Sequence, residues 1–198
     1  MRLIFVRHGE TEENTDKIIQ GQLIHGKLSE NGLKQIKKLA DRLKDEKIDY
    51  IYSSDSERSE ETAKEIAKYH PHIKVELVKD LRERHYGKFE GKKYTEIPDW
   101  DIIRYTPDYD MEGGESMKDV FKRMELFLDK IFQRHKNDTV LWVGHGMSGK
   151  HLTALVSGKV VEKVKELPHI HNTSISIFEI NEDKKHKIHV LNDVTHLT

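Results

Sequence analysis

Leu3-Ile4-Phe5-Val6-Arg7-His8-Gly9, near the start of the chain, is the most informative segment for the fold. Its first four residues form a short continuous apolar run, which predicts a buried strand. The run ends abruptly in a cation, an imidazole and a glycine. In open α/β sheets, ligands bind beyond the carboxyl ends of the strands, so these polar residues stand where a site is expected.

Along the rest of the chain, apolar periodicity predicts an alternation of strands and helices. Further strands are predicted over 48–52, 73–78 and 139–143, and helices over 29–43, 56–69, 116–132 and 146–156. Near the end, 174–180 and 186–191 flank Asn181-Glu182-Asp183, which is typical of a hairpin turn. The order predicts a three-layer α/β/α domain with a mostly parallel central sheet and an antiparallel hairpin at its edge.

One segment, residues 79–114, departs from this alternation and carries two of the four prolines. It is too long for an ordinary connection, so we interpret it as a wall or lid of a functional site. No linker interrupts the chain, and we therefore expect a single domain over residues 1–198.

The composition excludes several classes of protein. The chain has 198 residues, with 34 Lys and Arg against 35 Asp and Glu, a net charge of −1. This balance argues against nucleic acid or an anionic membrane as the main partner. The absence of cysteine excludes disulfides and thiolate chemistry. No apolar stretch is long enough to span a bilayer, and the N-terminus does not resemble a signal peptide, so a cytoplasmic protein is expected; a homodimer is compatible with the sequence.

Each predicted strand is followed by polar residues suited to phosphate chemistry. Arg7 and His8 follow the first strand, Arg58 the second, Glu83 the third and His145 the fourth. Because parallel strands end at the same edge of a sheet, we expect these five side chains to converge.

Such a set suffices for phosphoryl transfer. Two arginines hold a phosphoryl group through charge-assisted hydrogen bonds, and the neutral imidazole of His8 attacks phosphorus. His145 and the helix amides at Gly146 stabilise the transition-state oxygens. Glu83 protonates the leaving alkoxide and then accepts a proton from water, which predicts a mildly acidic optimum. No metal is required, because the cationic side chains neutralise the phosphoryl charge.

These residues and their context resemble the histidine phosphatase superfamily, which contains the cofactor-dependent phosphoglycerate mutases. Val6-Arg7-His8-Gly9-Glu10-Thr11 resembles its Arg-His-Gly motif, and Gly144-His145-Gly146 resembles the segment of its second histidine. Ser54 to Ala63 resembles its second-arginine motif, and Gly113-Gly114-Glu115-Ser116 its next helix opening. The resemblance covers most of the chain. It implies a phosphohistidine on His8, a proton donor in Glu83, and phosphate contacts from Asn14 and the Gln20-Gly21 pair.

Two branches of that family remain open. Glu83-Arg84-His85-Tyr86-Gly87 resembles the mutases, whereas Phe89-Glu90-Gly91 and Asn172-Thr173-Ser174 resemble the phosphatases. The paired arginines of the mutases are absent from residues 100–105, which offer only Arg104. We therefore predict a phosphatase that needs no cofactor. The alternatives are a mutase that depends on 2,3-bisphosphoglycerate and a non-catalytic phosphate-binding or interaction protein of the same fold.

The wall segment bears on the substrate. It is rich in aromatic residues, namely Tyr86, Phe89, Tyr94, Trp100, Tyr105 and Tyr109. Their faces favour a substrate with an apolar or sugar portion, whereas Arg84 and Arg104 favour acidic phosphorylated metabolites. Together they predict a small phosphorylated metabolite without naming it.

Further histidines raise the question of a metal site. His169-x-His171 and His186-x-x-His189 have a spacing that a metal accepts, but no cysteine or matching acidic partner accompanies them. We predict ordinary surface histidines and no metal. His70 and His135, near the ends of predicted elements, are also expected to be exposed.

Overall fold

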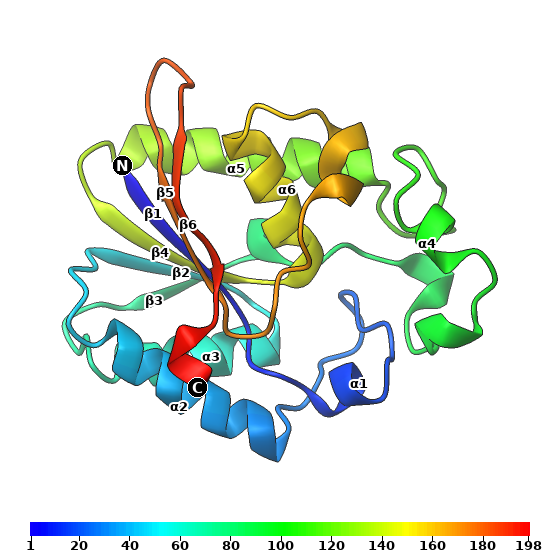
Figure 1. The fold of residues 1–198 in the computed structure, drawn as a ribbon, viewed down its shortest axis with the longest axis horizontal. Helices are drawn as coiled ribbons and strands as arrows, with labels where there is room; N and C mark the ends of the chain where they lie inside the picture. Colours follow the sequence, from blue (N-terminus) through cyan, green and yellow to red (C-terminus); the bar gives the residue numbers. More distant parts are fainter.

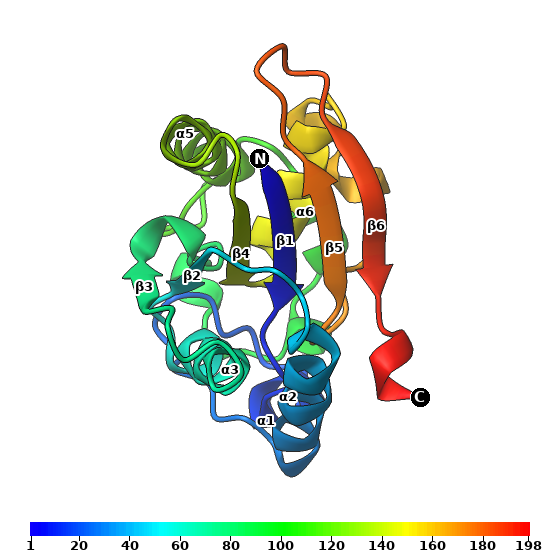
Figure 2. The same ribbon diagram turned by 90° about the vertical axis from the view of Figure 1, so that its left-hand side faces the viewer.

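The computed structural model describes residues 1–198, and a six-stranded sheet lies at its centre (Figures 1 and 2). The strands are β1 (Arg2–Arg7), β2 (Tyr50–Ser54), β3 (Val75–Val78), β4 (Thr139–Gly144), β5 (Ile175–Glu179) and β6 (Lys187–Asp193). Their order is β3-β2-β4-β1-β5-β6. The first four strands pair in parallel, whereas β5 is antiparallel to β1 and β6 to β5. The predicted mostly parallel sheet with an antiparallel hairpin at one edge is confirmed.

Helices cover both faces of the sheet. The longer ones are α2 (Glu30–Leu43), α3 (Glu57–Ala67), α5 (Met117–Arg134) and α6 (Gly146–Val156). In Figure 1, α5 and α6 lie above the sheet and α2 and α3 below it. Along β1, Leu3 and Phe5 join the apolar cluster of α5 and α6, while Ile4 and Val6 join that of α2 and α3. A strand buried on both faces is apolar at successive positions, which explains the continuous run at the start of the chain.

Side-chain caps fix where two of these helices begin. The Ser29 hydroxyl accepts a hydrogen bond from the Gly32 amide at 2.9 Å, and Ser116 caps α5 through the Asp119 amide at 3.1 Å. Each cap satisfies an amide that the first helical turn leaves without a partner. Helix α6 begins at Gly146, two residues after β4 ends, so its first amides lie at the edge of the sheet.

Short elements make up the remainder. They are α1 (Glu12–Thr15), α4 (Trp100–Ile103) and 3-10 turns at Lys79–Leu81, Gly87–Phe89, Tyr94–Glu96, Val161–Glu166 and Thr195–Leu197. The wall segment, 79–114, contains α4 and extends beyond the sheet at the side where α1 also lies (Figure 1). Tyr86, Phe89 and Trp100 pack there in a small cluster with Ile19 and Met111. None of the helices has the length and apolar character needed to cross a bilayer.

Two predictions about single elements were wrong: the bounds of one strand and the burial of one helix residue. Strand β2 begins at Tyr50 and runs to Ser54, two residues later than predicted. Its last residues, Ser53 and Ser54, pair with β3 although they are polar, so apolar periodicity did not reveal them. The apolar periodicity of residues 29–43 includes Leu33 and so predicts that it faces the core, but in α2 this residue is 45% exposed. The buried residue in that turn is Gly32, which lies against the backbone of Glu10.

The prediction that His70 and His135 are exposed was also wrong. Both are buried, and each ring finds partners within the fold. His70 Nε2 lies 3.2 Å from the carbonyl oxygen of Leu43. His135 lies between the hydroxyl of Tyr52 at 2.9 Å and the carboxylate of Asp138 at 3.1 Å. These hydrogen bonds compensate for the water that each ring loses on burial.

Candidate active site

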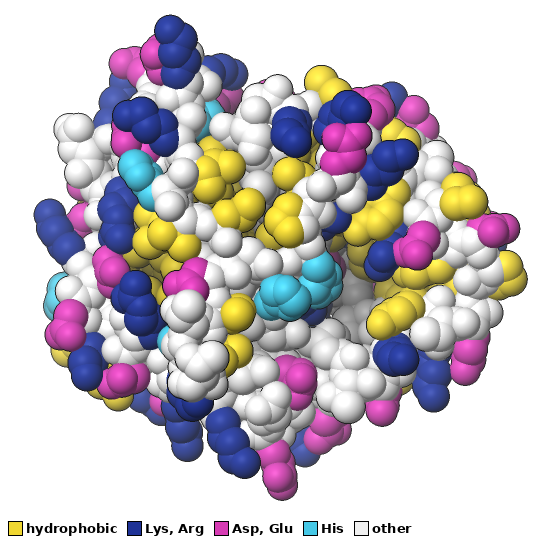
Figure 3. All heavy atoms as spheres, viewed as in Figure 1, with side chains coloured by type: hydrophobic (Ala, Val, Ile, Leu, Met, Phe, Trp, Pro, Cys, Tyr) yellow, Lys and Arg dark blue, Asp and Glu magenta, His cyan; other side chains and the backbone are white.

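A pocket of about 140 Å³ brings together residues that follow β1, β2 and β3. Figure 3 shows the hollow on the surface, with histidine side chains on one rim. Its lining consists of Arg7, His8, Asn14, Ile18, Ile19, Gln20, Gly21, Arg58, Glu83, Tyr86, Tyr94, Trp100 and Arg104. The structure thus gathers every predicted site residue on this lining except His145, Arg84 and Gly146.

His8 lies at the base of the site with its tautomer fixed. Its Nδ1 is 2.7 Å from the carbonyl oxygen of Gly9, to which it donates a hydrogen bond, and this leaves the Nε2 lone pair free. Burial, followed by the positive charges of Arg58 and Arg7, holds the pKa of His8 well below its usual value. The imidazole is therefore neutral near pH 7, which is the state that a nucleophile needs.

Arg7 and Arg58 are buried without a carboxylate partner. Arg58 donates to three backbone carbonyls within residues 21–25 at 2.8 to 3.2 Å, and Arg7 donates to the Ile170 carbonyl at 2.7 Å. Burial lowers the pKa of both guanidinium groups, that of Arg58 to about 10. Both remain charged at neutral pH, so the backbone holds two cations beside His8.

His145 lies beside His8 with a ring-centroid separation of 5.1 Å. Its Nε2 is 2.9 Å from the hydroxyl of Ser54 and 3.3 Å from those of Ser56 and Ser59. Burial, together with the nearby positive charges, holds the pKa of His145 well below its usual value. In this neutral ring a hydroxyl donates to Nε2, and Nδ1 carries the proton.

Three buried donors around His8 have no partner within the protein. They are Nε of Arg7, Nε of Arg58 and Nδ1 of His145. Buried polar groups are nearly always hydrogen-bonded, so three such groups in one place mark a site for a ligand that accepts hydrogen bonds. With two guanidinium groups among them, the arrangement fits an anion, and tetrahedral oxyanions such as phosphate fit it in particular.

The carboxylate of Glu83 is held at the start of α6. Its Oε1 accepts hydrogen bonds from the amides of Arg84 at 2.8 Å and Ser148 at 3.2 Å. Its Oε2 accepts one from the Met147 amide at 3.0 Å. The amino end of a helix favours a carboxylate through its free amides and dipole. Oε2, with a single hydrogen bond, is the oxygen that has room for a proton.

The loop after β1 supplies the rest of the lining. Asn14 Oδ1 accepts hydrogen bonds from the Thr11 amide and from Asn172 Nδ2, each at 3.2 Å, so its own Nδ2 remains free as a donor. Gly21 has a φ of +54°, and a Cβ there would overlap the carboxylate of Glu90. Only glycine therefore satisfies both the backbone conformation and the space at this position.

Arg84 and Gly146, which were predicted to bind substrate, lie next to the pocket and not on its lining. Arg84 is fully buried, and its guanidinium donates to the carbonyls of Glu115 and Arg104, both at 2.7 Å. It braces the wall from behind instead of lining the pocket. At Gly146 a Cβ would lie 3.6 Å from Cζ of Arg7 and 3.7 Å from Oε2 of Glu83, so this residue sits between them.

Sequence reasoning missed residues that hold the site together through the backbone. Asn172 Nδ2 donates to the His8 carbonyl at 3.0 Å as well as to Asn14. The Glu90 side chain is 2% exposed and accepts hydrogen bonds from the amides of residues 22–23 and Tyr86 at 2.7 to 3.0 Å. Both lie in segments that carried the family resemblance, but residue type alone did not indicate these contacts.

The histidine pairs are separate from any cluster of acidic residues. No group of three or more His, Asp or Glu side chains lies close enough to hold a metal. His169 and His171 are both exposed and stack edge to face at 5.3 Å. His169 Nε2 lies 3.2 Å from a guanidinium nitrogen of Arg7. Partial burial of the ring, and then the charge of Arg7, lowers the pKa of His169 to about 4, so this ring accepts a hydrogen bond from the arginine.

Comparison with known proteins agrees with this geometry. Residues 3–194 match the family model of the histidine phosphatase superfamily, branch 1. Phosphoglycerate mutase-like protein 4 of Arabidopsis thaliana is 35% identical, over 98% of this chain and 86% of that protein. The metal-independent phosphoserine phosphatase of Arabidopsis thaliana is 33% identical, over 99% of this chain and 83% of that protein. The solved structure of Bacillus stearothermophilus YhfR superposes with a TM-score of 0.91 at 31% identity, over 100% of this chain and 99% of that one. Because this family model matches nearly the whole length of the chain, the chain belongs to branch 1 of the histidine phosphatase superfamily.

Proposed function

We propose that the protein hydrolyses phosphomonoesters of small metabolites through a phosphohistidine on His8. One observation carries the proposal: three buried donors without partners surround a neutral imidazole whose Nε2 is free. The donors come from Arg7, Arg58 and His145. They match the three peripheral oxygens of a phosphoryl group, whose charge the two arginines offset as the transition state forms.

In the first step, Nε2 of His8 attacks phosphorus, and the bond between phosphorus and the leaving oxygen breaks. Glu83 transfers its proton to that oxygen, so the product leaves as an alcohol and not as an alkoxide. The Gly9 carbonyl keeps its hydrogen bond from Nδ1 and stabilises the positive charge that develops on the imidazole.

In the second step, water attacks the phosphorus of phosphohistidine, and the bond to Nε2 breaks. The Glu83 carboxylate accepts a proton from that water and is ready for the next cycle. Inorganic phosphate leaves, and His8 returns to its neutral form. The arginines and His145 hold the same three oxygens throughout, because only the axial groups change.

The size and lining of the pocket support a small substrate. About 140 Å³ admits a phosphoryl group and a few further atoms. Tyr86, Tyr94 and Trp100 contribute aromatic surface, and Arg104 contributes the one further cation of the lining. A phosphorylated small metabolite that carries a second polar group fits this environment, and one of the relatives is by its name a phosphoserine phosphatase.

Phosphoglycerate mutase activity is the second candidate, favoured by Arg104 on the lining and by the name of one relative. A mutase must retain a doubly charged intermediate while it reorients, and this requires several cations beyond the phosphoryl site. Beyond Arg7 and Arg58, the lining offers only Arg104 for that role. Hydrolysis is therefore the proposal that the lining supports better. The convergence of Arg7, His8, Arg58 and Glu83 supports a catalytic protein over a non-catalytic one.

Phosphate release from a panel of phosphomonoesters tests this function. Isomerisation of 3-phosphoglycerate is followed in parallel, with and without 2,3-bisphosphoglycerate. We expect hydrolysis without isomerisation, and we expect EDTA to leave the rate unchanged because arginine side chains neutralise the phosphoryl charge. Isomerisation that depends on bisphosphoglycerate would identify a mutase. A large loss of rate with EDTA would contradict the metal-independent mechanism.

The pH dependence of kcat/KM is expected to lack an acid limb near 6.5. His8 must be unprotonated to react, and its lowered pKa keeps it so as the pH falls from neutral to mildly acidic values. An acid limb at about 6.5 that nuclear magnetic resonance assigns to His8 would contradict this role.

A further inference from the structure

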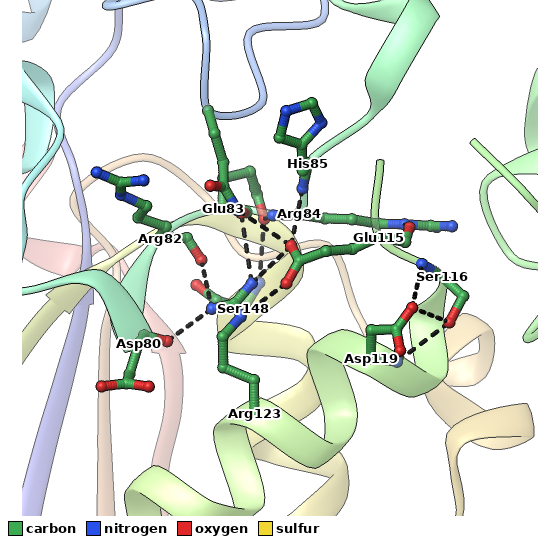
Figure 4. Close-up of polar contacts among 11 residues, drawn as sticks. Asp80, Arg82, Glu83, Arg84, His85, Glu115, Ser116, Asp119, Arg123 and Ser148 are labelled. Atoms are coloured by element: carbon green, nitrogen blue, oxygen red, sulfur yellow. Dashed lines mark hydrogen bonds and ion pairs between the residues drawn. The ribbon is translucent and has the colours of Figure 1, made fainter. Parts of the chain in front are cut away.

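Glu83 belongs to a polar network that extends to α5 (Figure 4). Glu115, two residues before α5, and Arg123, in the second turn of that helix, form its centre. Figure 4 shows their side chains facing each other beneath the segment that carries Glu83. Neither residue lines the pocket, and both are largely buried, at 17% exposure for Arg123 and 22% for Glu115.

Arg123 joins the helix to the segment that carries Glu83. Its Nε and one terminal nitrogen bind the two carboxylate oxygens of Glu115 at 2.8 and 2.9 Å, as a bidentate pair. Its other terminal nitrogen donates to the carbonyls of Asp80 at 2.6 Å and Arg82 at 3.1 Å. The first of these terminal nitrogens also lies 3.5 Å from the carbonyl of Glu83 itself. One side chain thus binds three carbonyls in four residues.

Glu115 completes the attachment from the other direction. Its Oε2 accepts hydrogen bonds from the His85 amide at 2.9 Å and from Gln22 Nε2 at 3.1 Å. Gln22 Nε2 also donates to the Glu83 carbonyl at 2.9 Å. The segment on either side of Glu83 is therefore bound to the same ion pair, as is the loop that carries Gly21 and the rest of the phosphate lining.

The two helices divide the task of holding Glu83. Helix α6 binds the carboxylate through the amides of Met147 and Ser148. Helix α5, through Arg123 and Glu115, binds the main chain behind it. A proton donor must stay within hydrogen-bond reach of the leaving oxygen, and a displacement of about 1 Å costs on the order of 10²-fold in rate.

We propose that the Glu115–Arg123 pair is a positioning device that keeps Glu83 in place for proton transfer. The proposal rests on the proposed function, in which Glu83 protonates the leaving group. The pair touches neither substrate nor reacting atoms, so its loss acts through the segments that it holds, and of these only the segment of Glu83 supplies the proton. Its signature is dependence on the leaving group: a poor leaving group needs the proton, whereas a good one departs without it.

The test compares two substrates of similar shape, 4-nitrophenyl phosphate and benzyl phosphate. The nitrophenolate is a good leaving group, and the benzyl alkoxide is a poor one. We expect Arg123→Gln to lower kcat for benzyl phosphate about tenfold more than for 4-nitrophenyl phosphate, in the same direction as Glu83→Gln. Arg134→Gln, on the same helix but in an exposed pair with Glu76, is expected to change neither rate.

A double variant separates positioning from stability. If Arg123 acts through Glu83, then Arg123→Gln adds no further selective loss in the Glu83→Gln background. Glu115→Gln, which keeps the size and one acceptor oxygen of the side chain, provides the same comparison if Arg123→Gln does not fold. Thermal unfolding of each variant shows whether it is folded. In Arg123→Lys, we expect the ratio of kcat for benzyl phosphate to kcat for 4-nitrophenyl phosphate to recover in part.

The variants test the positioning role of the ion pair and the assignment of Glu83 separately. The positioning role would be overturned if Arg123→Gln and Glu115→Gln lowered kcat equally for both substrates, or did not lower it at all. If Glu83→Gln still lowered kcat selectively for benzyl phosphate, the assignment of Glu83 as proton donor would stand. If Glu83→Gln itself showed no selective loss, the assignment of Glu83 would fail, and the positioning role with it.

Discussion

Replacing His8 with alanine is expected to lower kcat by a factor of about 10⁴ or more, because the nucleophile is lost. No other side chain takes over: His145 presents its unpartnered Nδ1 as a proton-bearing donor, and its Nε2 is engaged by serine hydroxyls. The measurement is phosphate release under saturating substrate. It is joined by alkaline quenching of the protein with radiolabelled substrate, since phosphohistidine is stable in alkali and labile in acid.

The wild-type protein is expected to retain label after the quench, and the His8→Ala variant to retain none. His72→Ala serves as the matched control, since His72 is exposed and lies outside the pocket lining. Circular dichroism and thermal unfolding verify that the variant is folded. Turnover near the wild-type rate in a folded His8→Ala protein would end the nucleophile assignment.

Replacing Arg58 with alanine is expected to lower kcat/KM about 10³-fold, since it removes both a donor and a charge from the transition state. The variant also loses the hydrogen bonds that hold the carbonyls of residues 21–25. A second effect arises from electrostatics. The charge of Arg58 is the largest cause after burial that lowers the pKa of His8, so this pKa rises in the variant. Kinetics and the nuclear magnetic resonance titration of His8 measure the two effects separately.

Arg58→Lys separates charge from geometry. A lysine keeps the positive charge, so the pKa of His8 stays low, but it lacks the planar fork and the Nε–H donor. We therefore expect kcat/KM to recover only in part. Arg42→Ala, at an exposed arginine of α2, is the control and is expected to behave as wild type. A value of kcat/KM within about threefold of wild type in Arg58→Ala would contradict the phosphate role.

Local sequence patterns predicted the order of the elements better than the exact ends of each strand. Continuous apolar runs and capped amphipathic helices are local patterns, so the order of strands and helices was predicted from them. Residues such as His8 and Arg58 lie shortly after strand ends, and parallel topology brings strand ends together, which is why they were found. Ser53 and Ser54 extend β2 without apolar character, so the pattern placed that strand two residues early.

Buried polar residues were the ones that local patterns did not reveal. His70 and His135 stand at element ends, where exposure is the ordinary expectation, yet partners distant in sequence enclose them. Arg84 stands next to Glu83 in the chain, but its guanidinium turns to the wall while the neighbouring carboxylate lines the pocket. Glu90 and Glu115 resemble surface acids until their backbone partners are known.

The order of the elements, the parallel sheet and the five groups at its carboxyl edge were predictable from the sequence. They depend on local periodicity and on the residues that come directly after each strand. Three features became known only from the folded arrangement: the donors around His8 that lack partners, the Glu83 oxygen that has room for a proton, and the contacts of Arg123 with the segment behind Glu83. Those facts depend on hydrogen bonds between residues 30 to more than 100 positions apart in the chain, and no pattern along the sequence encodes such pairings directly.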